Sequence, residues 1–275
     1  ASNPASAQMS EPEIWNYEPE VGSSEYLSLR TRALRYRSLV PSMLYATTCC
    51  RPETAFAISK LCQHLDNPSE CHLKCADQTL SYMVETADLG ITYYPDGTLR
   101  DANLTGYYSP LKEGLCGLSD SNWCTGRSTS GFLIQYGGGS VSWMSKRQPV
   151  TALSSTEAEY YAASSCGQEI LFLRHFLRDI GYDEPAPTRL KIDNSACVKL
   201  GEYFESAKRV RHIDRRVHFL TDYQEDGVLK VEPISTHLNT SDMMTKPLPK
   251  DKFVMFRRHA LGMRSATVCA TSRSI

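Results

Sequence analysis

The order of predicted elements after residue 114 constrains the fold of this chain more than any other feature. Three short strand patterns come first, and a run of glycines at 137–139 joins the second to the third, as in an antiparallel meander. A long helical pattern then runs from about Ser155 to Ile180, with Gly181 as its expected end and Ser155 or Thr156 as its expected cap. The strands are expected at residues 115–123, 131–136, 140–144, 189–192 and 228–234, and further helices at 194–200, at 213–225 and from about 240. The order β-β-β-α-β-α-α-β-α predicts an α/β fold with a central mixed sheet.

The first part of the chain has a different pattern. Apolar residues recur at helical spacing over residues 25–90, with a boundary or kink expected at Pro41. A second helix is expected to begin near Pro52, a third to cover residues 69–86, and a short strand to occupy residues 91–94. We therefore expect a linker or disordered arm at 1–24, a mainly helical segment at 25–110, an α/β domain at 111–260 and a C-terminal tail at 261–275.

Composition excludes few functions. The formal net charge is −1, so any contact with nucleic acid depends on local basic patches rather than on a basic field of the whole chain. No apolar run approaches the length of a membrane span, and we expect no membrane partner. The N-terminus carries no basic and apolar targeting segment.

Four acidic residues in short distinctive contexts carry the chemistry: Asp120, Glu159, Asp193 and Asp242. Asp120 lies within a predicted strand of apolar and small residues, where a buried carboxylate is costly unless it is paired or binds a cation. Asp193 ends a predicted strand, where open α/β sheets place ligand-binding groups, although a helix cap also explains an aspartate there. Carboxylates that converge from separate elements form a natural site for hard cations such as Mg²⁺.

Sequence blocks around these acids resemble the ribonuclease H domain of copia-type LTR retrotransposon polyproteins over residues 115–260. The blocks are Ser119-Asp120-Ser121-Asn122-Trp123, Arg127-Ser128-Thr129-Ser130-Gly131-Phe132, Ser140-Val141-Ser142-Trp143-Met144-Ser145-Lys146-Arg147-Gln148, Ser154-Ser155-Thr156-Glu157-Ala158-Glu159-Tyr160, Asp193-Asn194, His212-Ile213-Asp214 and Asp242-Met243-Met244-Thr245-Lys246-Pro247-Leu248. Upstream, Tyr36-Arg37-Ser38-Leu39-Val40 and Arg51-Pro52-Glu53 resemble the C-terminal end of the reverse transcriptase, the thumb and connection region. The resemblance implies a ribonuclease H-like fold with a five-stranded sheet.

The resemblance also implies an activity and its site. The family cleaves the RNA strand of RNA–DNA hybrids during reverse transcription with two Mg²⁺ ions, for which Mn²⁺ can substitute. It implies that Asp120 bridges both ions, that Asp193 and Glu159 bind one each, and that Asp242 completes the set. Glu157 is the alternative ligand, but residues two apart on a helix differ by roughly 200°, so only one of the two glutamates can face the site. The implied partners are the hybrid and the polymerase part of the same polyprotein, in a cytoplasmic retrotransposon particle or in the nucleus.

Several other residues are candidates for catalysis or for binding nucleic acid. His237 precedes Asp242 by five residues and resembles a proton-handling histidine, although a solvent-exposed loop histidine explains it equally well. Basic residues that could hold phosphates are Lys146, Arg147, Lys208, Arg209, Arg211 and Arg215. Trp123 and Trp143 are expected in the core.

Three other functions compete with this interpretation. The chain could be a catalytically drifted or host-adopted fragment that binds nucleic acid or protein. It could be an integrase or transposase, although those enzymes order their acids Asp, Asp, Glu. It could be a zinc-dependent nuclease that uses His64, Cys71, His72 and Cys75, although two small core residues on one helical stripe explain the cysteines.

Overall fold

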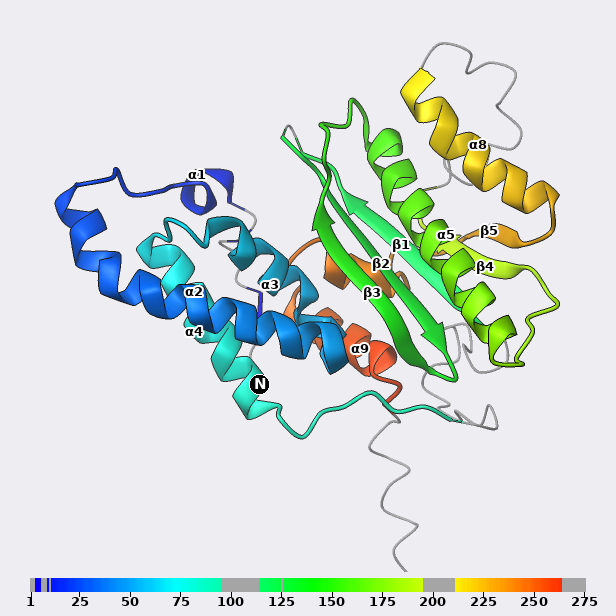
Figure 1. The fold of residues 1–275 in the computed structure, drawn as a ribbon, viewed down its shortest axis with the longest axis horizontal. Coiled ribbons are helices and arrows are strands. Elements are labelled where there is room, and N and C mark those ends of the chain that lie inside the picture. Colours follow the sequence, from blue (N-terminus) through cyan, green and yellow to red (C-terminus); the bar gives the residue numbers. More distant parts are fainter. Residues whose placement is uncertain are drawn as a thin grey trace, which may run out of the picture. The chain divides into compact units, whose positions relative to one another are not determined.

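Five strands form one mixed sheet in the order β3-β2-β1-β4-β5 (Figure 1). The structure is a computed structural model that describes residues 3–5, 9, 11–94, 114–124, 126–194 and 211–263, without the side chains of 12, 211–215 and 217. The strands are β1 (Cys116–Asn122), β2 (Thr129–Tyr136), β3 (Gly139–Arg147), β4 (Thr188–Ile192) and β5 (Leu229–Pro233). β1, β2 and β3 pair antiparallel as a meander, whereas β4 and β5 run parallel to β1. The predicted α/β fold with a central mixed sheet is confirmed.

The strand register brings chemically important residues to one end of this sheet. Asp120 pairs with Gly131, which pairs in turn with Ser145. On the other side of β1, Ser119 pairs with Ile192, the last residue of β4. Because β1 and β4 are parallel, Asp193 follows β4 at the level where Asp120 lies in β1.

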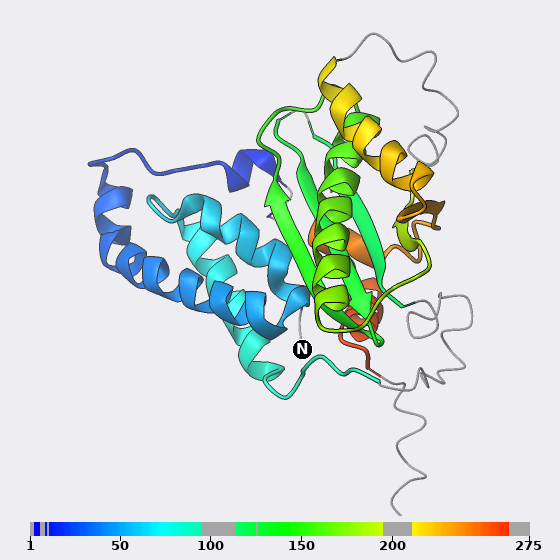
Figure 2. The same cartoon turned by 45° about the vertical axis from the view of Figure 1, so that its right-hand side comes forward.

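Helices cover both faces of the sheet. α5 (Ser155–Asp179) lies along one face and α8 (Arg211–Glu225) packs beside it, as both views show (Figure 2). A Cβ on Gly117 would lie 2.8 Å from Ile170 Cδ1 of α5, which shows how closely the helix approaches β1. The other face carries the 3₁₀ helix η5 (Thr240–Met244) and the C-terminal residues of α9 (Lys250–Ala260).

Three features of the secondary structure differ from the sequence expectation. Ser154, not Ser155 or Thr156, caps α5, since its hydroxyl accepts a hydrogen bond from the Glu157 N–H at 3.1 Å. Residues Ile91–Tyr94 form no strand, because their backbone bonds go to two separate segments: Thr92 N–H donates to Leu261 at 2.9 Å and Tyr94 N–H to Gly137 at 2.8 Å. The last helix also begins later than expected, since η5 ends at Met244 and α9 starts at Lys250. The expected helix at 194–200 lies almost wholly outside the described residues.

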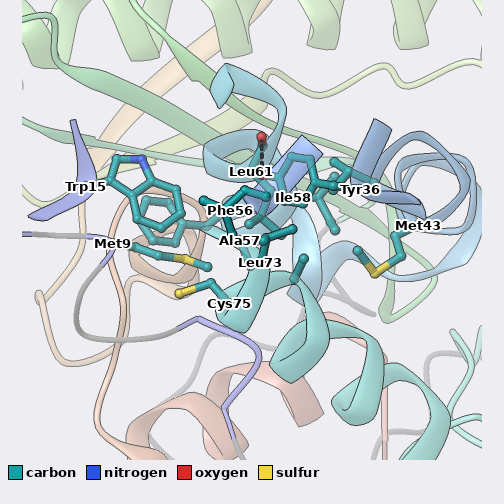
Figure 3. Close-up of a cluster of buried hydrophobic side chains, with 13 residues drawn as sticks. Met9, Trp15, Tyr36, Met43, Phe56, Ala57, Ile58, Leu61, Leu73 and Cys75 are labelled. Atoms are coloured by element: carbon teal, nitrogen blue, oxygen red, sulfur yellow. Dashed lines mark hydrogen bonds between the residues drawn. The ribbon is translucent and has the colours of Figure 1, made fainter. Parts of the chain in front are cut away.

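The chain divides into two units: residues 1–90 with 246–255, and residues 91–245 with 256–275. The first unit is helical, as predicted for residues 25–90. Its elements are α1 (Pro12–Trp15), α2 (Ser24–Cys50), η2 (Pro52–Thr54), α3 (Ala55–Leu61), η3 (Cys62–His64) and α4 (Glu70–Glu85). Their apolar faces meet in one core, in which Phe56, Ile58 and Leu61 of α3 are buried (Figure 3). Across this core, the Tyr36 hydroxyl donates to the Leu61 carbonyl at 2.8 Å.

Pro41 does not end or divide its helix, contrary to the sequence expectation. α2 continues from Ser24 to Cys50 although proline removes one backbone N–H donor. Buried residues lie on both sides of the proline, namely Tyr36 and Val40 before it and Met43 after it. Burial of this face on both sides of Pro41 stabilises the continuous helix.

The N-terminal segment that was expected to be a linker packs onto the first unit where the structure describes it. Met9 and Trp15 are 1% and 2% exposed. The Pro4 carbonyl accepts from Thr79 Oγ1 at 3.0 Å, and the Trp15 carbonyl bonds His72 Nε2 at 2.8 Å. These two hydrogen bonds connect an early and a late residue of the N-terminal segment, Pro4 and Trp15, to α4.

Candidate metal centre

Three carboxylates from three different elements meet at one end of the sheet. Asp120 comes from β1, Glu159 from the first turns of α5, and Asp193 directly follows β4. Each offers a ligand oxygen, and these oxygens lie within 4.8 Å of one another. Among the described residues this is the only group of three or more His, Cys, Asp or Glu side chains with metal-binding spacing. We call it the three-acid group.

Burial makes this convergence unusual. Asp120 and Glu159 are 2% and 6% exposed, and Asp193 is half-buried. Burial and then the charges of Asp120 and Asp193 raise the pKa of Glu159 to about 9. A buried set of acidic oxygens is costly on its own, and a hard cation among them would remove that cost.

The hydrogen bonds of Glu159 fit a ligand role. Its Oε1 accepts the Ser121 backbone N–H at 3.2 Å, which anchors the carboxylate at the end of β1. Its Oε2 is buried and has no hydrogen-bond partner among the residues that the structure describes. Since buried polar atoms are nearly always satisfied, this oxygen is suited to bind a cation. The donor set of this site, hard carboxylate oxygens, therefore fits Mg²⁺ or Mn²⁺.

Glu157 points elsewhere. Its Oε2 accepts the Leu153 backbone N–H at 2.7 Å, while its own N–H is bonded to the capping Ser154 hydroxyl. Glu157 is 2% exposed, so burial alone does not distinguish the two glutamates. The difference lies in orientation, because Glu157 serves the start of α5 whereas Glu159 joins the three-acid group.

Asp242 was predicted as the fourth ligand and lies outside the three-acid group. It is fully buried in η5, on the sheet face opposite α5. Its backbone carbonyl accepts from the N–H of Thr245 at 3.2 Å. The hydroxyl of Thr245 donates to Asp120 Oδ2, so Asp242 adjoins the group through this threonine. The assignment of Asp242 as a ligand stays a prediction.

The sequence interpretation missed two residues of this site, Thr245 and Gly131. Thr245 contacts Asp120 as just described, and Gly131 pairs with Asp120 across the β1–β2 ladder. A glycine inside a strand often marks a close approach of another backbone, and that signal was available at Gly131. Thr245 lies inside the Asp242-Met243-Met244-Thr245-Lys246 block but carries no signal of its own.

The remaining candidate residues are only partly described. His237 is exposed between β5 and η5, where its backbone N–H donates to Ser235 Oγ at 3.4 Å. Lys146 and Arg147 are exposed at the end of β3, and their partners in β2 are Ser130 and Thr129. Lys208 and Arg209 lie outside the described residues, as do the side chains of Arg211 and Arg215, whose backbone belongs to α8.

Trp123 was expected in the core but is 45% exposed. Its indole N–H donates to the Ala152 carbonyl at 3.1 Å, which connects the end of β1 to the loop before α5. Trp143 is half-buried. The strand pattern placed both tryptophans in β strands, but β1 ends at Asn122, so Trp123 projects beyond the covered part of the sheet.

The zinc alternative is not supported by the histidines of the first unit. His72 uses both ring nitrogens: Nδ1 accepts from the Ser69 N–H at 2.9 Å and Nε2 bonds the Trp15 carbonyl at 2.8 Å. Burial and the neighbouring His64 lower the pKa of His72 to about 4, with the Trp15 carbonyl opposing the shift. A histidine with two occupied nitrogens caps a helix and holds the N-terminal segment, and it is not available as a zinc ligand.

Comparison with known proteins gives relatives over most of the chain. No family model matches. The Retrovirus-related Pol polyprotein from transposon TNT 1-94 of Nicotiana tabacum is 33% identical over 231 residues, which cover 84% of this chain and 16% of that polyprotein. The polyprotein from transposon RE2 of Arabidopsis thaliana is 30% identical over 81% of this chain and 15% of its own length. The chain thus spans about a sixth of these relatives.

Other similarities cover about half of the chain. The Secreted RxLR effector protein 161 of Plasmopara viticola is 37% identical over 142 residues, which are 50% of this chain and 90% of the effector. Among solved structures, RNase H1 from Halobacterium salinarum matches 48% of this chain and 93% of its own, at 15% identity and a TM-score of 0.36. No described helix combines the length and apolarity needed to cross a bilayer.

Three relatives that are 30–33% identical to this chain over 81–84% of its length are transposon Pol polyproteins. The sheet is mixed and five-stranded, as the resemblance implied. The chain belongs to the copia-type retrotransposon Pol polyproteins, of which it matches a segment with a ribonuclease H-like fold.

Proposed function

We propose that this segment is a metal-dependent endonuclease that hydrolyses the RNA strand of RNA–DNA hybrids. The observation that carries the proposal is the three-acid group, whose Glu159 has one buried oxygen without a hydrogen-bond partner among the described residues. Its acids follow the order Asp, Glu, Asp along the chain, with the glutamate on the first long helix. That order differs from the Asp, Asp, Glu order of integrases and transposases.

Each residue of the group has a distinct proposed role. Asp120, Glu159 and Asp193 would hold Mg²⁺, which when bound lowers the pKa of water and stabilises charge on a leaving oxygen. Ser121 orients Glu159 through its backbone N–H. Asp242 remains the proposed fourth ligand, and His237, in an exposed loop, is proposed to move a proton near the product oxygen.

The hybrid would bind across the end of the sheet that carries the acids. Lys146 and Arg147 lie at this end, since their β2 partners Ser130 and Thr129 pair with Ser121 and Asn122. Exposed cations beside the acidic site would hold phosphates of the substrate backbone. We propose that residues 111–260 form the nuclease domain and that residues 25–110 are the end of a polymerase from the same polyprotein. The cytoplasmic retrotransposon particle is the proposed location.

Cleavage of an end-labelled RNA–DNA hybrid in Mg²⁺ tests the proposal. We expect 5′-phosphate and 3′-hydroxyl products, and we expect Asp120→Asn to abolish cutting while the circular dichroism spectrum is retained. Glu159→Gln should reduce the rate at least tenfold more than Glu157→Gln, because only Glu159 joins the acids. Full activity of Asp120→Asn would contradict the proposal, and a larger loss in Glu157→Gln would reassign the ligand.

A second candidate function has one observation in its favour. The similarity to a secreted effector protein covers half of this chain, so relatives of this sequence occur under a name other than transposon polyprotein. The second candidate is a drifted or host-adopted segment that binds nucleic acid or protein without cutting. Retained hybrid binding with no cleavage in Mg²⁺ or Mn²⁺ would favour this candidate over the enzyme.

A further inference from the structure

We propose that Thr245 is a positioning residue that fixes the orientation of the Asp120 carboxylate within the three-acid group. The inference rests on the proposed metal-dependent function and assigns a new role to a residue that lies outside the four acids. Thr245 is fully buried, and its hydroxyl donates to Asp120 Oδ2.

The hydroxyl of Thr245 has two acceptors for one proton. Asp120 Oδ2 is the closer, and the Asp242 carbonyl lies at 3.1 Å. A carboxylate accepts a stronger hydrogen bond than a neutral carbonyl, so the proton belongs to Asp120. One oxygen of Asp120 is thereby held before any cation binds, and the carboxylate cannot rotate freely toward Glu159.

Thr245 is itself held against the sheet by η5. Asn239 precedes this 3₁₀ helix, and its Nδ2 donates to the Ser119 carbonyl at 3.1 Å, next to Asp120 in β1. Asn239 also accepts from the Ser241 hydroxyl at 2.5 Å. At the other end of η5, the Thr245 N–H donates to Asp242 at 3.2 Å. Asn239, Ser241 and Asp242 thus fix the backbone from which the threonine hydroxyl projects.

Gly131 provides the space that this arrangement needs. A Cβ on Gly131 would lie 2.5 Å from Met244 Cβ and 2.7 Å from Thr245 Cγ2. The Met244 backbone carbonyl carbon would be only 3.2 Å away, so η5 would have to shift. Since Gly131 pairs with Asp120, the bare glycine lets η5 approach the sheet beside the carboxylate that Thr245 contacts.

The test removes the hydroxyl while keeping the shape of the side chain. Thr245→Val should weaken Mn²⁺ binding to the full chain by about 10- to 100-fold, the usual loss when a partner of a metal ligand is removed. Binding is measured from free Mn²⁺ by electron paramagnetic resonance. In metal-free protein, the ¹³C chemical shift of the Asp120 carboxyl carbon should move in Thr245→Val relative to the parent chain.

Two control variants separate positioning from packing. Thr245→Ser keeps the hydroxyl and should retain the parent affinity and ¹³C shift. Thr240→Val also removes a buried threonine hydroxyl from η5, but that hydroxyl bonds His259 Nδ1 at 2.8 Å and not Asp120. The Mn²⁺ affinity of this variant should therefore equal that of the parent chain. Thr245→Ala serves as a second hydroxyl-free variant if the valine variant does not fold.

The outcomes distinguish this inference from the proposed function. Parent-like Mn²⁺ affinity and ¹³C shift in Thr245→Val would overturn the positioning role and leave the metal site intact. An equal loss in Thr245→Ser would also overturn it, because the methyl group would then be the cause. The proposed metal function fails if the parent chain binds no Mn²⁺, or if Asp120→Asn binds Mn²⁺ as well as the parent chain does. In that case the ¹³C shift alone decides whether Thr245 orients Asp120.

Discussion

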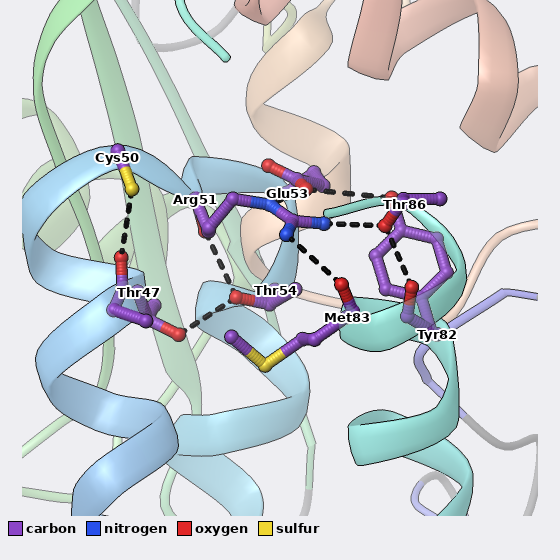
Figure 4. Close-up of polar contacts among 9 residues, drawn as sticks. Thr47, Cys50, Arg51, Glu53, Thr54, Tyr82, Met83 and Thr86 are labelled. Atoms are coloured by element: carbon purple, nitrogen blue, oxygen red, sulfur yellow. Dashed lines mark hydrogen bonds and ion pairs between the residues drawn. The ribbon is translucent and has the colours of Figure 1, made fainter. Parts of the chain in front are cut away.

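Each unit of this chain buries carboxylates, but the two units treat them in opposite ways. In the first unit, Glu53 is 2% exposed and its Oε1 lies 2.7 Å from Arg51 Nε (Figure 4). The guanidinium also donates to Thr86 Oγ1 at 2.5 Å and to the Met83 carbonyl at 3.4 Å. Burial lowers the pKa of Arg51, but Glu53 and Tyr82 together more than offset this, and the net pKa is raised. The two side chains form an ion pair through Glu53 Oε1.

The three-acid group of the second unit brings like charges together instead. Asp120 and Asp193 reinforce the effect of burial and raise the pKa of Glu159 to about 9. A buried ion pair is a structural solution that needs nothing from outside the chain. Converging acids are compatible with a stable fold only if protons or a cation bind among them. Like charges held together in this way are typical of functional sites. The contrast predicts that neutralising a charge has opposite effects in the two units.

The largest expected effect comes from breaking the ion pair of the first unit. Arg51→Met should lower the free energy of unfolding by about 3–5 kcal/mol, because Glu53 would remain buried without its partner. Urea unfolding followed by circular dichroism measures the loss. Arg37→Ala is the matched control, since its ion pair with Asp66 is exposed and is expected to contribute at most about 1 kcal/mol. If Arg51→Met and Arg37→Ala lowered the free energy of unfolding equally, the buried ion pair would not stabilise the first unit more than an exposed one.

The second prediction concerns pH. The folded pKa of Glu159 is raised from 4.5 to about 9, so its stabilising contribution is full below pH 4.5 and is lost as pH rises toward 9. In EDTA, the parent chain should lose about 2–3 kcal/mol of stability from this group between pH 5 and pH 7. Glu159→Gln should flatten that slope, whereas Glu157→Gln should not. A parent slope that persists in Glu159→Gln would show that this group is not the source.

The third prediction tests the close approach of η5 to the sheet. Gly131→Ala should cost about 1–3 kcal/mol, because its Cβ would overlap Met244 and Thr245. It should also weaken Mn²⁺ binding, since Thr245 would shift from Asp120. Gly126→Ala is the control, because nothing lies within 4 Å of the Cβ it would add. Parent-like stability and Mn²⁺ affinity in Gly131→Ala would show that η5 accommodates the methyl group.

The smallest expected effect is on substrate binding. Charge reversal of Lys146 and Arg147 should weaken hybrid binding and lower the slope of log affinity against log salt by about 1–2, one per lost phosphate contact. Fluorescence anisotropy across a salt series measures the slope. Arg178→Glu, at the far end of α5, should leave the slope unchanged. An unchanged slope in the double variant would exclude these residues from the interface.

Sequence patterns predicted the α/β fold because each strand and helix of the sheet domain has a clear period and clear ends. Three acids of the site were found through the resemblance, since each sits in a short block that matches the family in order and spacing. Helix geometry indicated that only one of Glu157 and Glu159 could face the site, and the resemblance favoured Glu159. The two side chains do bond different partners. Tertiary contacts decided the rest.

Pro41 did not break α2, because burial on both sides of it outweighs local preference. Residues Ile91–Tyr94 have the composition of a strand but bond two different segments, which no local pattern reveals. Thr245 was missed because its importance depends on a contact with Asp120, 125 residues away in the chain. Residues that act through another residue leave little trace in a single sequence.

The most direct test of the metal centre is a crystal structure of this chain grown with Mn²⁺, with the ions located by anomalous scattering. The account predicts manganese bound by carboxylate oxygens of Asp120, Glu159 and Asp193, with Glu157 still bonded to the Leu153 N–H. Manganese elsewhere, or no anomalous peak among three converged carboxylates at a saturating concentration, would contradict the account.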